Sequence, residues 1–274
     1  PAGARDAASQ SISEMVRTMA ERAAARSYAP PLPLPERDAL KGLAYDQYRD
    51  IRFRPSAALW RPDAIGHEVQ FFPLGWLYEQ PVEIKVVDKG EIVPVRASAD
   101  LFDIGSLAAA AGEPATRGFS GFRLHAALNR PDYLDEYLVF QGASYLRAVA
   151  RGQSYGLSAR GLSIDTARPS GEEFPAFRAF WIEKPARGSD AVVVHALLDS
   201  PSVTGAYTFL VRPGATTTMD VTASLFARRP LEHVGIAPLT SMYLHGPAQR
   251  RIANDFRPAV HDSDGLAILG GAGE

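Results

Sequence analysis

The sequence predicts an all-β fold, a large β-sandwich, preceded by one helix and an extended arm at its N-terminal end. Three observations predict it. Several short segments alternate apolar and polar residues, as strands with one buried face do. Clusters of Gly, Pro, Asn and Asp separate these segments, and only one clear amphipathic helical pattern is present. Repeated short strands with few helices favour two packed antiparallel sheets.

Residues 1–35 are predicted to form a helix and a stiff arm that lies against the main body. Ser11 and Glu14 have the spacing of a capping box, in which each side chain satisfies a free amide at a helix start. Apolar residues then recur at helical spacing. These residues are Ile12, Met15, Val16, Met19 and Ala20. The proline-rich segment 30–35 should end the helix, because proline lacks the amide donor and prefers an extended backbone.

Residues 36–274 are predicted to form the sandwich. Val69, Phe71 and Pro73 alternate with Gln70 and Phe72, and segment 82–86 alternates apolar and polar residues. Segment 191–198 is a more continuous apolar run that suits a strand buried on both faces. Segments 205–212 and 217–226 are rich in Val, Thr, Tyr and Phe. The Pro-Gly turn between them predicts a hairpin.

Composition excludes several classes of protein. The chain has 274 residues, of which 46 % are hydrophobic and 22 % charged, as in globular proteins with a real core. A net charge of −2 without a basic run argues against a nucleic-acid surface. No stretch approaches the ~20 apolar residues that a membrane span needs. Because the chain starts at Pro1 without a methionine or an apolar signal region, we expect a mature end left after cleavage.

The string HDSDGL, residues 261–266, gathers a histidine and two aspartates. A calcium loop would need glycine at position 6 and glutamate at position 12, but counting from Asp262 places Gly265 at position 4. Zinc would want further histidines at short spacing, and the sequence contains no cysteine. A metal site is therefore not predicted. A G-x-G-x-x-G turn and a Walker motif are also absent, so no cofactor is implied.

Carboxylate chemistry survives this comparison. Glycoside hydrolysis needs one carboxyl to protonate the leaving oxygen and a second to activate water or attack the anomeric carbon. Asp262 and Asp264 lie two residues apart, so in a strand both would point to one face. Other candidates are Asp165, Asp199 and the pair Glu172-Glu173. By residue type, each of these is expected more often in a turn, at a cap or on a solvent-exposed charged surface than in a catalytic role. From chemistry alone the site stays open.

Ordered strings then carry a resemblance to a known family. They are YDQYRDIRF (45–53), GFSGFRLH (118–125), GASYLRA (142–148), YGLSARGLSIDT (155–166), GEEFPAF (171–177), LLDSPSVTGAY (197–207), GIAPLTSM (235–242) and HDSDGL. From about residue 45 onward the chain resembles the periplasmic glucan biosynthesis proteins, the G and D proteins of osmoregulated periplasmic glucans. LLDSPS and HDSDGL are shared by both branches.

The resemblance implies an exported, periplasmic protein with a sandwich like that of galactose mutarotase, followed in the family by an immunoglobulin-like domain. It implies action on linear β-1,2-glucan by inverting hydrolysis or backbone processing. Asp262 matches the aspartate that resembles the general base, and His261 and Asp264 would shape the turn around it. Sugar contacts are expected at four matched positions. They are Arg123, Tyr145, Tyr155 and Arg160, which offer ring faces for pyranoses and guanidinium forks for hydroxyls.

One departure limits the resemblance. The family's presumed general acid lies in a string beyond residue 274, so the sandwich is expected to be incomplete at its C-terminal end and the second carboxylate absent. Two hypotheses stay open: a β-1,2-glucanase-like hydrolase in full-length form, and a glucan-binding scaffold without chemistry. The implied partners are β-1,2-glucan oligosaccharide or polysaccharide, the inner-membrane glucan synthase and a second copy of the chain; nucleic acid is not implied.

Overall fold

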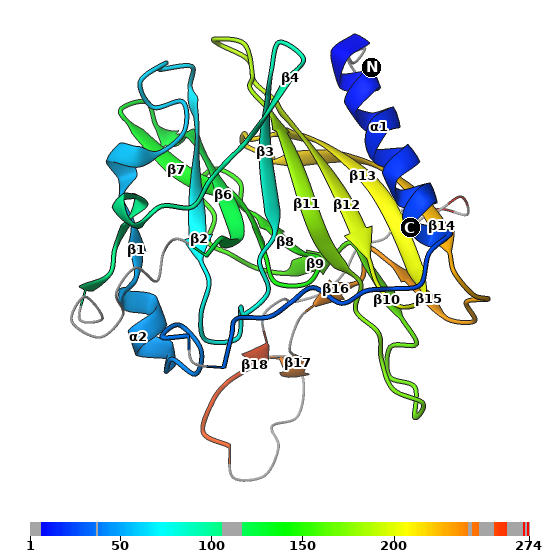
Figure 1. Ribbon diagram of the computed structural model, residues 1–274. Helices are drawn as coiled ribbons and strands as arrows, with labels where there is room; N and C mark the ends of the chain where they lie inside the picture. Colours follow the sequence, from blue (N-terminus) through cyan, green and yellow to red (C-terminus); the bar gives the residue numbers. More distant parts are fainter. Residues whose placement is uncertain are drawn as a thin grey trace.

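Two six-stranded β-sheets packed face to face form the body of the protein. The computed structural model describes residues 7–36, 38–105, 117–240, 243–246, 255–261, 271 and 273. One long helix, α1 (Ala7–Ala24), lies against the outer face of one sheet (Figure 1). The predicted all-β sandwich with an N-terminal helix is confirmed.

The first sheet has the strand order β14-β13-β12-β11-β3-β4. Its strands are β3 (Glu83–Asp88), β4 (Glu91–Pro94), β11 (Ala176–Glu183), β12 (Val192–Asp199), β13 (Val203–Arg212) and β14 (Thr218–Ala227). Only the β11–β3 pair is parallel. The predicted hairpin is present, with Arg212 opposite Thr218 at the turn.

The second sheet has the order β16-β9-β8-β7-β6-β2 and is antiparallel throughout. Its strands are β2 (His67–Pro73), β6 (Phe119–Arg130), β7 (Tyr133–Gln141), β8 (Tyr145–Ala148), β9 (Ser158–Arg160) and β16 (Leu239–Thr240). The alternating pattern predicted β2. The residues of the central strands β6, β8 and β9 appear in the sequence analysis only within the strings that carry the family resemblance, and no pattern predicted them as strands.

Short elements decorate the ends of the sandwich. They are α2 (Tyr45–Asp50), the 3-10 turns Pro55–Ala57 and Ala99–Leu101, and three two-stranded pairs: β1 (Arg52–Phe53) with β5 (Phe102–Asp103), β10 (Leu162–Ile164) with β15 (Val234–Ile236), and β17 (Tyr243–His245) with β18 (Val260–His261). Helix α2 follows Ala44, whose amide donates to the Gln47 side chain at 2.9 Å. It positions the tyrosines discussed below.

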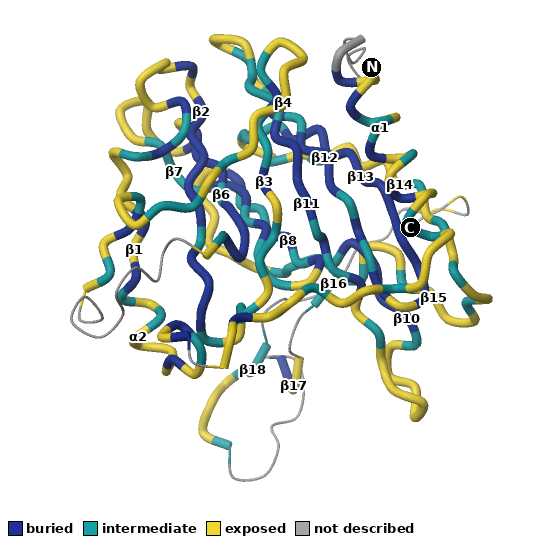
Figure 2. Tube along the Cα trace, in the orientation of Figure 1, coloured by how far each residue is buried: buried dark blue, intermediate teal, exposed yellow. Residues whose placement is uncertain are grey.

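Phenylalanines fill the space between the sheets. Phe140 of β7 has ring centroids at 5.2 Å from Phe122, 5.3 Å from Phe180 and 5.1 Å from Phe209, so one ring joins strands of both sheets. Edge-to-face and offset contacts of this kind add to the stabilisation that burial gives. The facing strands are largely buried in Figure 2.

Helix α1 covers the outer face of the first sheet. Its apolar stripe packs on Trp181 of β11 and Ala206 of β13. Of the five predicted residues, Ile12, Val16 and Ala20 are buried in this contact and Met15 packs partly against it, whereas Met19 is 38 % exposed. Strand β12 is therefore buried on both faces, also as predicted. The capping box was wrong: the helix already runs from Ala7, so Ser11 and Glu14 lie inside it, and Glu14 accepts from Arg17 at 3.1 Å.

The arm after α1 is held at both ends. Arg228 donates to the carbonyl oxygens of Ala23 at 2.8 Å and Arg26 at 2.9 Å, and the Leu34 amide donates to the Glu79 carbonyl at 3.0 Å. Figure 1 shows the arm running from the end of α1 past the lower ends of β12 and β11. In the part of the chain that the structure describes, no helix is long and apolar enough to cross a membrane.

Candidate functional site

The outer face of the second sheet is polar, in contrast to its inner face. Strand alternation sends Phe122 and Leu124 of β6 into the core, so Arg123 between them points outward. The ladder places Arg123 beside Gln70 of β2 and Val139 of β7, and it places Tyr145 of β8 beside Arg160 of β9. The sequence period therefore gathers arginines and tyrosines on one surface.

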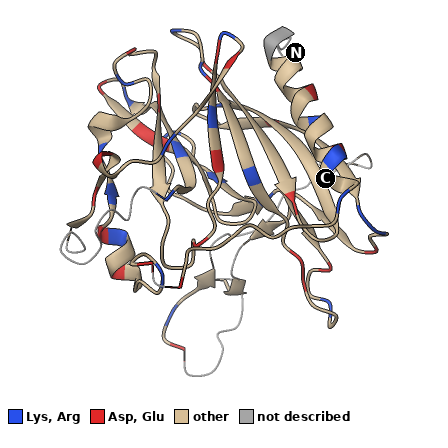
Figure 3. Ribbon diagram, in the orientation of Figure 1, with Lys and Arg blue, Asp and Glu red and all other residues tan. Residues whose placement is uncertain are grey.

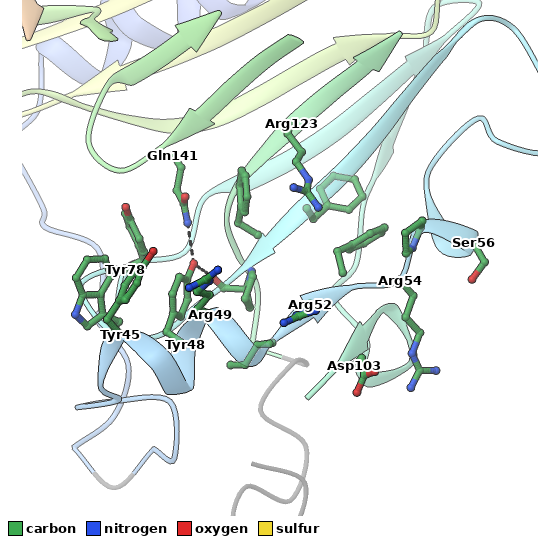
Figure 4. Close-up of a pocket in the computed structure, with 17 residues that line it drawn as sticks. Tyr45, Tyr48, Arg49, Arg52, Arg54, Ser56, Tyr78, Asp103, Arg123 and Gln141 are labelled. Carbon is green, nitrogen blue, oxygen red and sulfur yellow. Dashed lines mark hydrogen bonds between the residues drawn. The ribbon is translucent and has the colours of Figure 1, made fainter. Parts of the chain in front are cut away.

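Two adjoining hollows lie on this surface. The first, of about 820 Å³, lies between α2, β1, the end of β2 and the 75–78 turn (Figure 4). The second, of about 400 Å³, lies over β7, β8 and β9. Tyr78 and Gln141 line both hollows. We call the two together the groove.

An aromatic cluster forms one wall of the groove. Trp76 has ring centroids at 5.2 Å from Tyr45, 6.1 Å from Tyr48 and 5.8 Å from Tyr78. Trp76 has φ +53°, a left-handed conformation that is costly for a bulky residue and is found preferentially at functional sites. The Gly75–Tyr78 turn, closed by backbone hydrogen bonds of 2.9 and 2.8 Å, holds it there.

The floor between the two hollows is a hydrogen-bonded network. Gln141 Nε2 donates to the hydroxyl oxygen of Tyr48 at 2.8 Å (Figure 4) and to that of Ser120 at 3.0 Å. Tyr48 in turn donates to the Pro73 carbonyl at 3.1 Å. Burial raises the pKa of Tyr48 to about 12, so its hydroxyl stays a neutral donor. This network fixes Tyr48 and Gln141 in place.

A carboxylate joins Arg123 to Tyr155. Arg123 donates to Glu136 at 2.9 Å and to Gln70 at 2.8 Å, and the Tyr155 hydroxyl donates to the other Glu136 oxygen. The Arg147 guanidinium lies 4.0 Å from the centroid of the Tyr155 ring. Burial, followed by the Glu136 carboxylate, raises the pKa of Tyr155 well above its usual value. Glu136 therefore aligns two of the expected sugar contacts.

Arg160 lies between two aromatic rings. Its guanidinium carbon is 3.7 Å from the centroid of Phe174 and 4.6 Å from that of Tyr145, and Nη2 donates to the Tyr145 hydroxyl at 3.3 Å. Burial raises the pKa of Tyr145, but hydrogen bonds from Thr240 and Arg160 outweigh it and the net shift is downward. The Nε atoms of Arg123, Arg147 and Arg160 are buried and have no hydrogen-bond partner in the described part of the chain, so these three atoms are not accessible from the groove.

The structure brings most of the expected site residues together. Arg123, Tyr145 and Arg160 line the groove, and Tyr155 lies at its margin through Glu136. His261 lies in β18, opposite Tyr243 and 5.6 Å from its ring. Asp262 and Asp264 lie outside the described residues.

The sequence analysis missed several residues that line the groove or hold its side chains. Gln141, Arg147, Phe174, Tyr48, Trp76 and Tyr78 line it, and Gln70 and Glu136 hold Arg123. A signal existed for part of this set: polar residues at outward positions of strands whose inward positions are apolar. Basic and acidic residues are interspersed along the chain (Figure 3), so charge alone does not indicate the groove.

The other candidate carboxylates have structural roles. Asp165 lies in a turn with φ +54°, and Glu172 accepts from the Ala167 amide at 2.8 Å. Glu173 accepts from the Ser202 hydroxyl at 2.7 Å, and Asp199 pairs with Arg228 at 2.7 Å. Among the described residues, no group of three or more His, Asp or Glu side chains could hold a metal ion.

Comparisons with known proteins agree with the resemblance. The model of the family described as "Periplasmic glucan biosynthesis protein, MdoG" matches residues 12–274. "Glucans biosynthesis protein G" of Bradyrhizobium diazoefficiens is 53 % identical over 260 residues, covering 94 % of this chain and 51 % of that protein. The protein of the same name from Vibrio cholerae is 50 % identical over 242 residues, covering 88 % and 44 %. The chain spans about half the length of the curated relatives that it matches.

Proposed function

Because this chain belongs to the periplasmic glucan biosynthesis protein family MdoG, a family of periplasmic proteins, we propose that it binds linear β-1,2-glucan in the groove and acts in osmoregulated periplasmic glucan biosynthesis. The observation that carries the proposal is the groove itself. Aromatic rings and arginines from α2, β2, β6, β8 and β9 line adjoining hollows of about 820 and 400 Å³. Volumes of this size are typical of ligand sites.

Groove chemistry supports a sugar ligand. Tyr and Trp rings offer faces for the apolar side of a pyranose, and planar guanidinium groups offer paired donors to its hydroxyls. Arg123 lines the first hollow, and Arg147 and Arg160 line the second, so their guanidinium groups border the space in which such hydroxyls would lie. Glu136 and Gln141 fix the neighbouring side chains, so little ordering is needed when a glucan binds.

For the reaction, we propose inverting hydrolysis or backbone processing with Asp262 as general base. Water attacks the anomeric carbon as the glycosidic C–O bond breaks; Asp262 takes the proton of the water, and a second carboxyl protonates the leaving oxygen. The resemblance assigns this second carboxyl to a position beyond residue 274. His261 and Asp264 would shape the turn around the base. We also propose that the chain divides into an N-terminal helix and arm, residues 1–35, and a sandwich domain, residues 36–274.

A glucan-binding scaffold is the alternative. Glu136, the acidic residue at the centre of the polar face, has its oxygens engaged by Arg123 and Tyr155. A carboxylate held in this way positions its neighbours, which suits binding as well as it suits catalysis. In this reading the protein presents nascent glucan to the inner-membrane synthase, as a monomer or as a homodimer.

Reducing-end release from linear β-1,2-glucan tests the proposal, with the intact protein and its Asp262→Asn variant measured in parallel. Cleavage that falls by orders of magnitude in the variant supports the hydrolase and its base. Binding without cleavage in both proteins supports the scaffold. Failure of both proteins to bind the glucan would refute the groove as a glucan site.

A further inference from the structure

A third hollow, of about 460 Å³, lies between the N-terminal arm and the lower ends of the two sheets. We call it the end chamber. Tyr28 and Pro33 of the arm form one wall, and Arg178 and Asp199 of the first sheet form another. Tyr78, Gly142, Ala143 and Phe174 line both the chamber and the second hollow of the groove.

We infer that the glucan path continues from the groove into the end chamber, where Arg178 and Tyr28 bind additional sugar residues of a long chain. This inference rests on the proposed function of the groove. It adds a binding site built from the arm and from the opposite sheet of the sandwich.

The passage from groove to chamber is shaped by one tight turn. Gly142, with φ +79°, joins β7 to β8, and a Cβ added there would lie 3.0 Å from the Tyr78 ring. Glycine therefore allows both the turn and the close approach of Tyr78. Because Tyr78 lines all three hollows, a chain that stacks on it in the groove already borders the chamber.

A β-bulge positions Arg178. Phe177 pairs with Leu198 and Ala179 pairs with Leu197, so Arg178 is the extra residue of β11. Bulges re-aim a side chain and are frequent beside functional sites. Here the bulge leaves Phe177 in the core and lets Arg178 line the chamber.

Arg178 also has donors to spare. Its Nη1 donates to Gln80 at 3.3 Å, and among the described residues it forms no ion pair within 4.0 Å. Partial burial lowers the pKa of Arg178, but a guanidinium remains charged. A half-buried guanidinium with no carboxylate in direct contact gains from hydroxyl acceptors supplied by a ligand.

The arm wall is fixed before a ligand binds. Arg228 anchors the start of the arm through the Ala23 and Arg26 carbonyls and pairs with Asp199, itself a chamber residue. The Leu34–Glu79 hydrogen bond anchors its end. Tyr28 lies between the two anchors, so its ring can contact a sugar with little loss of conformational freedom.

The chamber chemistry indicates a neutral sugar. Ring faces come from Tyr28, Trp76, Tyr78 and Phe174, whereas hydrogen-bonding groups come from Gln80, Arg178 and Asp199. Asp199 offsets the charge of Arg178, since the two side chains attract each other across the chamber. The chamber therefore has the same kinds of side chain as the groove: a carboxylate, an amide and a guanidinium among aromatic rings.

Calorimetric titration with linear β-1,2-glucans of increasing length tests the inference. The intact protein is compared with Arg178→Ala and Tyr28→Ala, and with Arg212→Ala as the control. Arg212 is at the other end of β13 from the chamber and pairs with Asp220. We expect affinity for the longest glucans to fall about tenfold in each chamber variant, the value of one charged hydrogen bond or ring contact. Affinity for the shortest glucans that bind should stay unchanged.

Each other outcome is decisive. If glucans bind but the chamber variants weaken every length equally or none, the end chamber is refuted while the groove remains. If no length binds to the intact protein, the proposed function fails and this inference with it. Circular dichroism checks the fold of each variant; should Arg178→Ala unfold, Tyr28→Ala on the extended arm decides the question.

Discussion

The two sheets share one core but differ on their outer faces. Helix α1 covers the first sheet, where Val16 and Trp181 are buried in one apolar cluster. Among the described residues, no helix covers Arg123, Tyr145 and Arg160 of the second sheet, and these side chains line the groove instead. The same strand alternation therefore serves packing on one sheet and ligand access on the other.

Polar groups under α1 show how the covered face differs. His195 is fully buried, with Nε2 2.5 Å from a Glu183 oxygen and Nδ1 3.0 Å from the Thr208 hydroxyl, which lies 3.2 Å from Ser13 of the helix. These linked side chains satisfy one another's polar atoms within the protein. On the groove face Arg123, Arg147 and Arg160 instead line open hollows. Polar groups enclosed between a sheet and a helix support the fold, whereas polar groups that border a hollow can contact a ligand.

Removing the ring that both sheets share should have the largest effect on stability. Phe140→Ala deletes a ring that is 1 % exposed and contacts four other phenylalanines. We expect the free energy of unfolding to fall by about 3–5 kcal/mol, from lost burial and a residual cavity. Chemical denaturation measures the change. Phe256→Ala, at a ring that is 88 % exposed, is the matched control and should change stability by less than about 0.5 kcal/mol.

Detaching the helix cover should have the next largest effect. Arg228→Ala removes donors to the Ala23 and Arg26 carbonyls and leaves Asp199 without its partner. We expect a loss of about 2–3 kcal/mol, because the group is charged and its side chain is only 9 % exposed. Thermal unfolding measures it beside Arg130→Ala, which breaks an exposed pair with Asp132. Equal losses in the two variants would show that Arg228 does not anchor the helix.

A smaller, pH-dependent effect is expected at the bottom of the sandwich. Glu173 accepts from the Ser202 amide at 3.0 Å and from its hydroxyl at 2.7 Å. Burial raises the pKa of Glu173, but hydrogen bonds from Ser200 and Ser202 and the Arg229 charge outweigh it, so the net shift is downward. A lowered carboxyl pKa stabilises the fold above the unfolded pKa, and this contribution is lost as pH falls through the folded pKa.

Glu173→Gln should therefore cost about 1 kcal/mol at pH 7. The difference from the unchanged protein should shrink as pH falls below the ordinary carboxyl range near 4.5. Urea denaturation at a series of pH values measures it. A difference that stays constant down to pH 3 would contradict the ionised role of Glu173.

The sandwich could be predicted because burial imposes a period of two on its strands. Segments 69–73, 82–86 and 191–198 predicted strands, and they match β2, β3 and β12, although β3 and β12 each begin one residue later than the predicted segment. The apolar stripe of α1 has its own period, which the core bears out. The capping box failed because Ala7 to Gln10 extend the helix by about one turn, and local spacing alone does not mark a helix start.

The groove could be predicted only in part. Arg123, Tyr145 and Arg160 stand at outward positions of regular strands, which residue patterns indicate. Glu136 could not be placed, because a register shift between Leu124 and His125 decides what it faces across the ladder. Bulges and left-handed residues arise from tertiary packing, so the sequence shows them only weakly.

Removing an arginine side chain from the groove should have the smallest effect on stability and the largest effect on glucan binding. Arg160→Ala loses ring contacts with Tyr145 and Phe174, and such contacts contribute about 0.5–1 kcal/mol at exposed sites. We expect unfolding to change by no more than that, while affinity for linear β-1,2-glucan falls about tenfold, the effect of one charged hydrogen bond. Isothermal titration beside thermal unfolding measures both quantities, with Arg130→Ala as the control on an exposed strand end. If Arg160→Ala instead lost stability as Arg228→Ala should, with binding intact, the groove face would be a packing surface like the one under α1.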